Sequence, residues 1–202
     1  MIHKAVKHLR TVDPVLERLM EKAGPVNVKA RRVAVFQSLV QAIIYQQLSG
    51  KAADTILGRF KALFGNGSFP AAAQVLGVPL ERLRSAGLSK PKANYIQGIA
   101  EKAGSGALPT LRECDGLTDA EIVQRLIELK GVGRWTVEMF LIFNLGRLDV
   151  LPVHDLGVRR GFQIAYRKRK MPEPEQLERL GEKWRPYRTV AAKYLWRAVD
   201  AL

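Results

Sequence analysis

Residues 131 to 155 hold three kinds of group that could do chemistry. Gly131 and Gly133 frame a tight hairpin in the sequence LKGVGR, Trp135 follows at once, and Asp155 lies in the sequence PVHD. Gly131 can take a positive φ just past a helix end, and Gly133 leaves the loop bare of side chains. Bare backbone N–H groups at the start of the next helix can hold a phosphate oxygen. The hairpin is therefore a candidate phosphate-binding loop.

The charge of the chain points to the same kind of partner. Its 202 residues include 33 Lys+Arg and 19 Asp+Glu, which gives a formal net charge of +14. Such an excess suits a polyanion, and nucleic acid is the first candidate, although it can also serve solubility alone. With Arg134 after the hairpin, the charge favours contacts to a DNA backbone, which carry no sequence information. A plain helix–turn–helix connection in a bundle is the alternative for the G-x-G pattern.

Other chemistries are excluded by the residues that the chain lacks. Its one cysteine, Cys114, excludes an intramolecular disulfide framework, a four-cysteine zinc site and an iron–sulfur cluster. The three histidines are too scattered to suggest a metal site. No apolar run approaches the length of a membrane span. We expect a soluble intracellular protein without a membrane partner.

The elements that must position these groups are helical. In FQSLVQAIIYQQL the apolar residues recur at the spacing of a buried helix face, and they are Phe36, Leu39, Val40, Ile43, Ile44 and Leu48. Thr118 and Glu121 have capping-box spacing, which predicts a helix start at 119. Further helices are predicted near 71–77, 79–86, 91–103, 134–145, 155–166, 174–183 and 187–200. Because no strand-like alternation is sustained, we expect an all-α fold.

The chain also divides into two parts by composition. A Pro-containing connection near 147–152 leads into a more polar and basic C-terminal third. We expect one helical lobe at 36–146, with a helix-hairpin-helix at about 118–145. The second lobe would combine residues 1–35 with 147–202. The basic run YRKRKMPEPEQ, residues 166–176, is predicted to be a solvated loop between helices.

Several of these motifs together resemble a known family. The segments FQSLVQAIIYQQLSGKAA, GLSKPKANYI, LKGVGRWT, LPVHD and WRPYRTVAAKYLW are similar to those of the DNA-3-methyladenine glycosylase II family, within the helix-hairpin-helix DNA glycosylase superfamily. The similarity extends over nearly the whole chain. The best-known bacterial members carry an extra N-terminal β-rich domain for which 202 residues leave no room, so the chain resembles a short form.

The resemblance implies a fold and an activity. The fold would be two-lobed, with the active-site cleft between the lobes. The protein would be a monomeric, monofunctional glycosylase that releases alkylated bases, such as 3-methyladenine and 7-methylguanine, from double-stranded DNA by hydrolysis. Relatives that also cut the strand have a lysine after the G-x-G-R of the hairpin, where its amine attacks the sugar. Here that position is Trp135, so no strand cutting is expected.

Asp155 matches the aspartate of the family signature, which implies that it is catalytic. An alkylated purine is positively charged and already leaves easily, so the remaining task is to stabilise an oxocarbenium-like sugar and to guide a water. The simpler reading of Asp155 is an N-cap for a helix that begins at 156, and both roles are compatible. Asp149 and Glu138 are rival carboxylates.

Aromatic faces recognise a cationic base well. Trp135 is the first candidate, with a core role as its alternative. Trp196 points roughly opposite to the main apolar stripe of its helix, at about 100° per residue, and the family has an active-site tryptophan here. Met139, one turn after Trp135, stands where well-studied relatives have an aromatic ring, which leaves the base preference open.

A base must be flipped out of the duplex before it can be cut, and an apolar side chain can fill the space that it leaves. Leu48 matches the family's intercalating leucine, with a core residue as the alternative reading. Gln47 beside it is expected at the gap or at the opposite base.

The remaining expected contacts are with the DNA backbone and with an ion. The expected backbone contacts are Gly131, Gly133, Arg134, Thr136, Lys90 and Lys92. No organic cofactor is expected. The family hairpin holds a monovalent cation, Na⁺ or K⁺, through main-chain carbonyls, which by position would be those of Ile127, Leu129 and Val132.

Two other functions remain open. One is a non-catalytic helix-hairpin-helix module that only binds DNA, which would need neither Asp155 nor the off-stripe Trp196. The other is a glycosylase for a different damaged or mismatched base, and the missing cluster cysteines argue against a mismatch enzyme.

Overall fold

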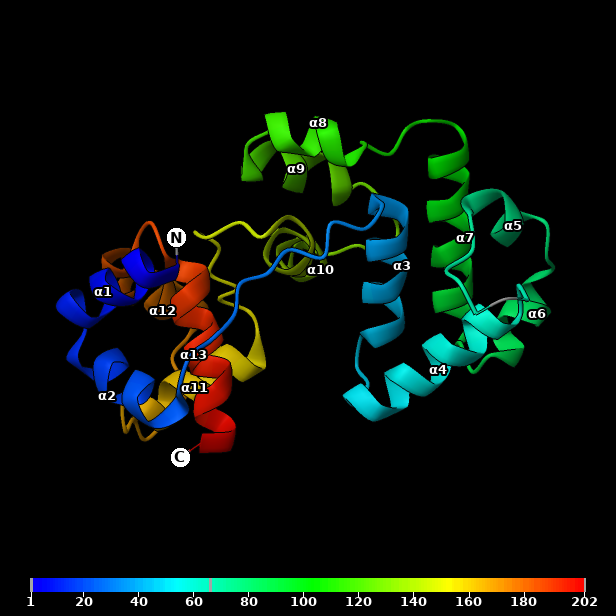
Figure 1. Cartoon of the computed structure of the whole chain (residues 1–202). Helices are drawn as coiled ribbons and strands as arrows, with labels where there is room; N and C mark the ends of the chain where they lie inside the picture. Colours follow the sequence, from blue (N-terminus) through cyan, green and yellow to red (C-terminus); the bar gives the residue numbers. More distant parts are fainter. Residues whose placement is uncertain (1, 66, 202) are drawn as a thin grey trace. The chain divides into compact units, whose positions relative to one another are not determined.

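The computed structural model describes residues 2–65 and 67–201. Within these ranges every regular element is a helix, and no strand occurs, so the all-α prediction is confirmed. The chain divides into two compact units, Met1–Arg31 with Leu141–Leu202 (unit 1) and Arg32–Phe140 (unit 2). The structure defines the interior of each unit, and the elements are labelled in Figure 1. No described helix has both the length and the apolar character that a membrane span requires.

Unit 2 is built around α3, the helix Val35–Tyr45. Its apolar stripe is buried at Leu39, Val40, Ile43 and Ile44, and it packs against α4, α7 and α10. The helices of this unit follow one another with short connections. They are α3, α4 (Gly50–Ala62), α5 (Ala72–Leu76), α6 (Leu80–Ser85), α7 (Lys90–Gly104), α8 (Leu111–Gly116), α9 (Asp119–Leu126) and α10 (Arg134–Met139). Of the three helices that pack against α3, α10 is the second helix of the hairpin, and α7 carries the two candidate phosphate-binding lysines at its start.

The start of α9 agrees with the sequence signal. Thr118 accepts a hydrogen bond from the Glu121 amide, while the Glu121 carboxylate accepts one from the Thr118 amide. This reciprocal pair satisfies two N–H groups that a helix start leaves without partners. The predicted helix start at 119 is confirmed, and it fixes where the first arm of the hairpin begins.

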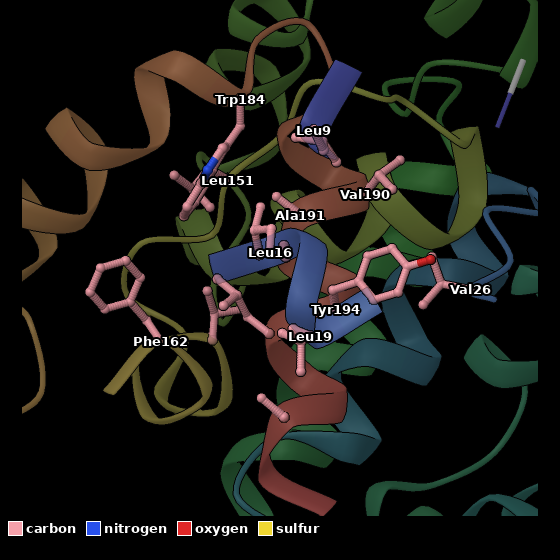
Figure 2. Packing of buried hydrophobic residues seen from close by; sticks show 14 of the residues in the cluster. Leu9, Leu16, Leu19, Val26, Leu151, Phe162, Trp184, Val190, Ala191 and Tyr194 are labelled. Atoms are coloured by element: carbon pink, nitrogen blue, oxygen red, sulfur yellow. The ribbon is translucent and has the colours of Figure 1, made fainter. Parts of the chain in front are cut away.

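Unit 1 joins both ends of the chain. Its described elements are α1 (Ile2–Val12), α2 (Pro14–Ala23), most of the π-helix η1 (Phe140–Leu145), α11 (Leu156–Ala165), α12 (Pro174–Gly181), the 3₁₀ turn η2 (Glu182–Trp184) and α13 (Arg188–Ala201). Figure 2 shows its core, where Leu9 and Leu16 gather with Trp184 and Ala191. The core thus joins residues from the first 20 positions of the chain to residues from its last 20.

Asp13 ties these distant segments together. It caps α2 by accepting from the amides of Val15 and Leu16, and it also accepts from the Trp184 indole at 2.8 Å and from the Tyr166 hydroxyl. The Lys183 ammonium lies 3.0 Å from the same carboxylate. Burial alone would raise the pKa of Asp13, but the hydrogen bonds to its ionised form outweigh burial and lower the pKa below its ordinary value.

Helices α11 and α13 approach each other at Gly161 more closely than any side chain at that position would permit. A Cβ atom at Gly161 would lie 1.8 Å from the Leu195 carbonyl oxygen, so only glycine fits there. The close approach brings the start of α11 next to the side chains of α13. This packing positions Asp155 and Trp196, which are described below.

The predicted elements differ from the structure in three respects. The helix predicted over 134–145 is instead α10, which ends at Met139, followed by the π-helix η1, whose wider turns the 3.6-residue periodicity does not reveal. The helix expected to carry Leu48 ends at Tyr45. Helices α1, α2 and α8 were not predicted.

The division between the units falls slightly before the boundaries 35/36 and 146/147 drawn from the sequence. At the second boundary, residues 141–146 belong to unit 1 and make contacts within it. The Arg31 amide donates to the Phe143 carbonyl at 2.9 Å, and the Phe143 ring stacks on Trp196.

Candidate active site and DNA interface

The hairpin between α9 and α10 is made of tight turns. The Val132 amide donates to the Leu129 carbonyl at 3.0 Å, and Gly131 has a φ of +84°. A Cβ at Gly131 would lie 2.3 Å from the Tyr95 ring, so both the backbone conformation and the space require glycine. Gly133 is exposed at the N-cap of α10, and no side chain caps that helix. The backbone at the start of α10 is therefore uncovered by side chains, as a phosphate-binding loop requires.

Gln46 connects this hairpin to the end of α3. Its side-chain amide donates to the Gly131 carbonyl at 3.0 Å and to Thr136 Oγ1 at 3.1 Å. Thr136 is buried, so its hydroxyl faces the protein, and a phosphate contact at this residue would have to come from its main-chain N–H. Sequence analysis did not identify Gln46, because its two partners lie 85 and 90 residues away.

The predicted wedge residues lie in an exposed turn after α3. Gln47 has a φ of +57°, a left-handed conformation that non-glycine residues rarely take, and it is exposed. Leu48 is 39% exposed, so the reading of Leu48 as one more core residue is wrong. A small pocket of about 220 Å³ borders this turn and is lined by Gln46, Gln47, Leu48, Ile56, Gly87, Leu88, Ser89 and Lys92. An exposed leucine on a constrained turn has the properties that an intercalating side chain needs.

The two lysines at the start of α7 differ in exposure and in hydrogen bonding. Lys90 is exposed, whereas Lys92 is half-buried. The Lys92 ammonium donates to the Ile44 carbonyl at 2.9 Å and to the Gln46 carbonyl at 2.7 Å, and burial lowers its pKa. Lys92, expected at a phosphate, is therefore bonded to the last carbonyls of α3.

Asp155 and Trp196 form a hydrogen-bonded pair in unit 1. Asp155 is the N-cap of α11, and its Oδ1 accepts from the Val158 amide at 2.8 Å, so the expected cap is present. The Trp196 indole N–H donates to the same oxygen, also at 2.8 Å. A Cβ at Gly157 would lie 2.9 Å from the Trp196 ring, so this glycine leaves room for the indole. The structure thus brings together the predicted carboxylate and one of the predicted aromatic residues, which lie 41 positions apart in the sequence.

Three further residues surround this pair and were missed by sequence reasoning. The ring of Phe143, in η1, stacks on Trp196 with centroids 5.7 Å apart and an interplanar angle of 25°. The Lys193 ammonium lies 4.6 Å from the Phe143 centroid, and the Arg31 guanidinium carbon lies 5.7 Å from it. Burial, with the nearby charges of Arg31 and Arg197, lowers the pKa of Lys193. The π-helix that presents Phe143 is a feature often found at functional sites.

The two rival carboxylates are engaged by arginines. Asp149 accepts from the backbone and side chain of Arg188, with Nε at 2.9 Å, and from Arg185 at 2.7 Å. Glu138 is buried and pairs at 3.1 Å with Arg134, one turn earlier on α10. Both carboxylates pair with arginines, and Oδ1 of Asp155 accepts from two neutral N–H groups. Arg134 keeps a largely exposed side chain, as a phosphate contact requires.

Trp135 and Met139, the other predicted base contacts, lie one turn apart on α10 in unit 2. Both side chains are half-buried, so each has a covered and an uncovered part. Within unit 2 the structure gathers the hairpin, the wedge turn and Lys92, and within unit 1 it gathers Asp155 with Trp196.

The monovalent cation that the resemblance implies stays a prediction for the hairpin carbonyls. Carbonyl oxygens are hard ligands of the type that suits alkali cations, and the carbonyls in question belong to Ile127, Leu129 and Val132. Leu129 accepts the Val132 amide, and its second lone pair can still bind a cation.

Comparison with known proteins gives the family. The family model for the HhH-GPD superfamily of base excision DNA repair proteins matches the sequence over residues 40–186. DNA-3-methyladenine glycosylase 1 of Schizosaccharomyces pombe is 38% identical over 196 residues, which cover 96% of this chain and 86% of that protein.

Solved structures agree with this relationship. The 3-methyladenine DNA glycosylase Mag1 of S. pombe in complex with abasic DNA superposes with a TM-score of 0.90, covering 96% of this chain and 95% of the other. DNA-3-methyladenine glycosidase from Bacillus halodurans is 41% identical, with a TM-score of 0.83 over 96% of this chain and 88% of the other. The chain is therefore a member of the HhH-GPD superfamily of base excision DNA repair proteins.

Proposed function

We propose that the protein is a monofunctional DNA glycosylase of base excision repair. It hydrolyses the N-glycosidic bond of alkylated bases such as 3-methyladenine and 7-methylguanine in double-stranded DNA. The observation that carries this proposal is the Asp155 carboxylate held by Trp196 and the α11 amide, in a chain similar over most of its length to DNA-3-methyladenine glycosylases. Such an enzyme works inside the cell, with the DNA.

Asp155 supplies the negative charge for the reaction. Alkylation at a ring nitrogen makes the purine a cation, so the base leaves with its bonding electrons without being protonated first. Positive charge then builds on the sugar, and a fixed carboxylate stabilises it and orients the water that attacks C1′. The proton lost by this water is accepted by the same carboxylate or by solvent. The Trp196 N–H and the cap amide fix the orientation of Oδ1 before the reaction begins.

The aromatic side chains supply base recognition. Trp196, stacked on Phe143, and the half-buried Trp135 offer ring faces of the kind that attract a cation. Met139 adds a polarizable apolar contact in place of a ring. This composition favours a planar cationic base over a neutral polar one.

Unit 2 supplies DNA binding and base flipping in this proposal. The hairpin backbone at Gly131 and Gly133 and the exposed Arg134 and Lys90 hold phosphates, while Leu48 and Gln47 enter the duplex. A Na⁺ or K⁺ ion bound by the carbonyls of Ile127, Leu129 and Val132 would supply positive charge beside the phosphate. Neither role depends on base sequence, as suits an enzyme that must search all DNA.

Trp135 stands where strand-cutting relatives have a lysine, so the reaction ends at an intact abasic site. To test the proposal, duplex DNA treated with a methylating agent is incubated with the protein, and the released bases are identified by chromatography. Release of 3-methyladenine and 7-methylguanine, with strands that break only after alkali or heat, is the expected result. DNA binding without base release would instead identify a non-catalytic module. A covalent protein–DNA adduct trapped by borohydride would contradict the monofunctional assignment.

A further inference from the structure

The turn that carries Gln47 and Leu48 has an unfavourable backbone conformation in an exposed position. Gln47 takes a φ of +57°, and its neighbour Gln46 is extended at φ −53° and ψ 130°. A left-handed non-glycine residue persists only when its surroundings hold it there. The groups that hold this turn therefore decide where the exposed Leu48 points.

Two side chains outside the turn's tip provide that support. Gln46 donates to the Gly131 carbonyl and to Thr136 Oγ1, which bonds the turn to the hairpin. Lys92, from the start of α7, donates to the carbonyls of Ile44 and Gln46 at 2.9 and 2.7 Å. A cation suits this place, because the carbonyl end of a helix carries partial negative charge.

These bonds form one continuous connection through unit 2. It runs from the Lys92 ammonium to the Gln46 carbonyl, and from the Gln46 amide to the hairpin carbonyl at Gly131. The hairpin and the Leu48 turn, which Gln46 joins, have different proposed tasks, since the hairpin holds phosphates and Leu48 enters the base stack. A rigid link between them would set the distance from the bound phosphate to the inserted side chain.

We propose that Lys92 and Gln46 are positioning residues for base flipping, which fix the Leu48 turn to the phosphate-binding hairpin. This inference rests on the proposed function and assigns to Lys92 a role other than phosphate binding. The ammonium is half-buried and already has two carbonyl partners at short distance. Its burial lowers its pKa, which agrees with an inward-facing position.

The test compares Lys92→Met with Lys102→Met, which removes the same charge from an exposed position on the same helix. Base release is measured on methylated duplex and single-stranded DNA, since only the duplex requires flipping against pairing. Lys92→Met should lower the duplex-to-single-strand rate ratio on the order of tenfold, the effect of about one hydrogen bond. Lys102→Met should leave the ratio unchanged.

A second readout needs no chemistry. When 2-aminopurine is placed opposite a mismatched base in a duplex, its fluorescence reports whether the 2-aminopurine unstacks when the protein binds. Lys92→Met and Gln46→Met should both reduce this signal at saturating protein. If circular dichroism shows that Lys92→Met is not folded, Gln46→Met alone provides the test. If the parent protein flips this base but releases no alkylated base, the proposed function fails while the positioning role can still be judged.

Affinity for undamaged duplex separates positioning from phosphate binding. Loss of a phosphate contact weakens binding to all sequences and lowers the slope of log K against log salt by about one. The positioning role predicts the same salt slope for Lys92→Met and for Lys102→Met. A lower slope for Lys92→Met alone, or equal losses of activity on duplex and single strands, would overturn the inference.

Discussion

The indole N–H of Trp196 donates to Oδ1 of Asp155 at 2.8 Å, so the proposed catalytic carboxylate and a proposed base-binding ring are a single hydrogen-bonded pair. The carboxylate is therefore oriented by the same side chain that offers its face to a base. A change in the ring is expected to alter catalysis as well as recognition.

Trp196→Phe tests this coupling. Phenylalanine keeps an aromatic face against Phe143 but removes the N–H that fixes Asp155. A hydrogen bond to a charged group is worth about 1.5–3 kcal/mol, so base release under single-turnover conditions should slow by roughly tenfold to a hundredfold. The free energy of unfolding, measured in urea, should change much less. Unchanged release from methylated DNA would show that the Trp196 N–H does not contribute to the reaction.

Gly161→Ala tests the close contact that places the pair. The added Cβ would lie 1.8 Å from the Leu195 carbonyl oxygen, so α11 and α13 must separate. We expect a loss of at least about 3 kcal/mol in the free energy of unfolding, in the range of severe overpacking. Gly98→Ala is the matched control, because a Cβ at this helical glycine meets nothing within 4 Å. The control should be stabilised by about 0.5–1 kcal/mol. Similar stability of the two variants would contradict the packing described for unit 1.

Asp13 should make the stability depend on pH. Because its pKa is lowered on folding, the folded state binds its proton less readily than the unfolded chain. The stabilisation is therefore complete above the pKa of the unfolded chain and is lost as the pH falls through the folded pKa. Asp13→Asn should cost at least about 2 kcal/mol at pH 7, since it leaves buried donors poorly paired. The difference in Tm between parent and variant should shrink below pH 4 (about the ordinary aspartate pKa). A difference that grows with acidity would reverse the assigned shift.

Leu48→Ala should separate flipping from chemistry. Leu48 is exposed, so truncation removes little from the core, and the melting temperature should stay nearly constant. Base release from duplex DNA should fall more than release from single-stranded or mismatched DNA, where unpairing costs less. Equal losses of base release on both substrates, with a large drop in melting temperature, would show that Leu48 has a packing role instead.

The sequence predicted those parts of the fold and site that have local signals. The capping box of Thr118 and Glu121, the glycines of the hairpin and the position of Asp155 before a helix are each determined by residues a few positions apart. The off-stripe direction of Trp196 was also readable from the helix period. These features need no knowledge of distant parts of the chain.

The rest depends on contacts between distant residues. Phe143 is presented by a π-helix, whose i→i+5 hydrogen bonds cannot be read from the nearly all-apolar sequence FLIFNL. The bonds of Gln46 and Lys92 join segments more than 40 residues apart, so a lysine assigned to phosphate from its position is bonded to carbonyls instead. The engagement of Asp149 by Arg185 and Arg188 likewise became visible only in the folded chain.

The central claim is that Asp155 provides the charge for base release, and its most direct test is the single-turnover rate of Asp155→Asn on methylated duplex DNA. Asparagine keeps an oxygen that can accept from the Val158 amide and cap α11, but it carries no charge. Asp149→Asn, measured in parallel with its Tm, controls for loss of a carboxylate elsewhere in unit 1. We predict that Asp155→Asn folds and binds DNA like the parent but releases bases about 10²–10³-fold more slowly, while Asp149→Asn remains active. If Asp155→Asn kept most of its activity while Glu138→Gln lost it, the carboxylate would be wrongly assigned.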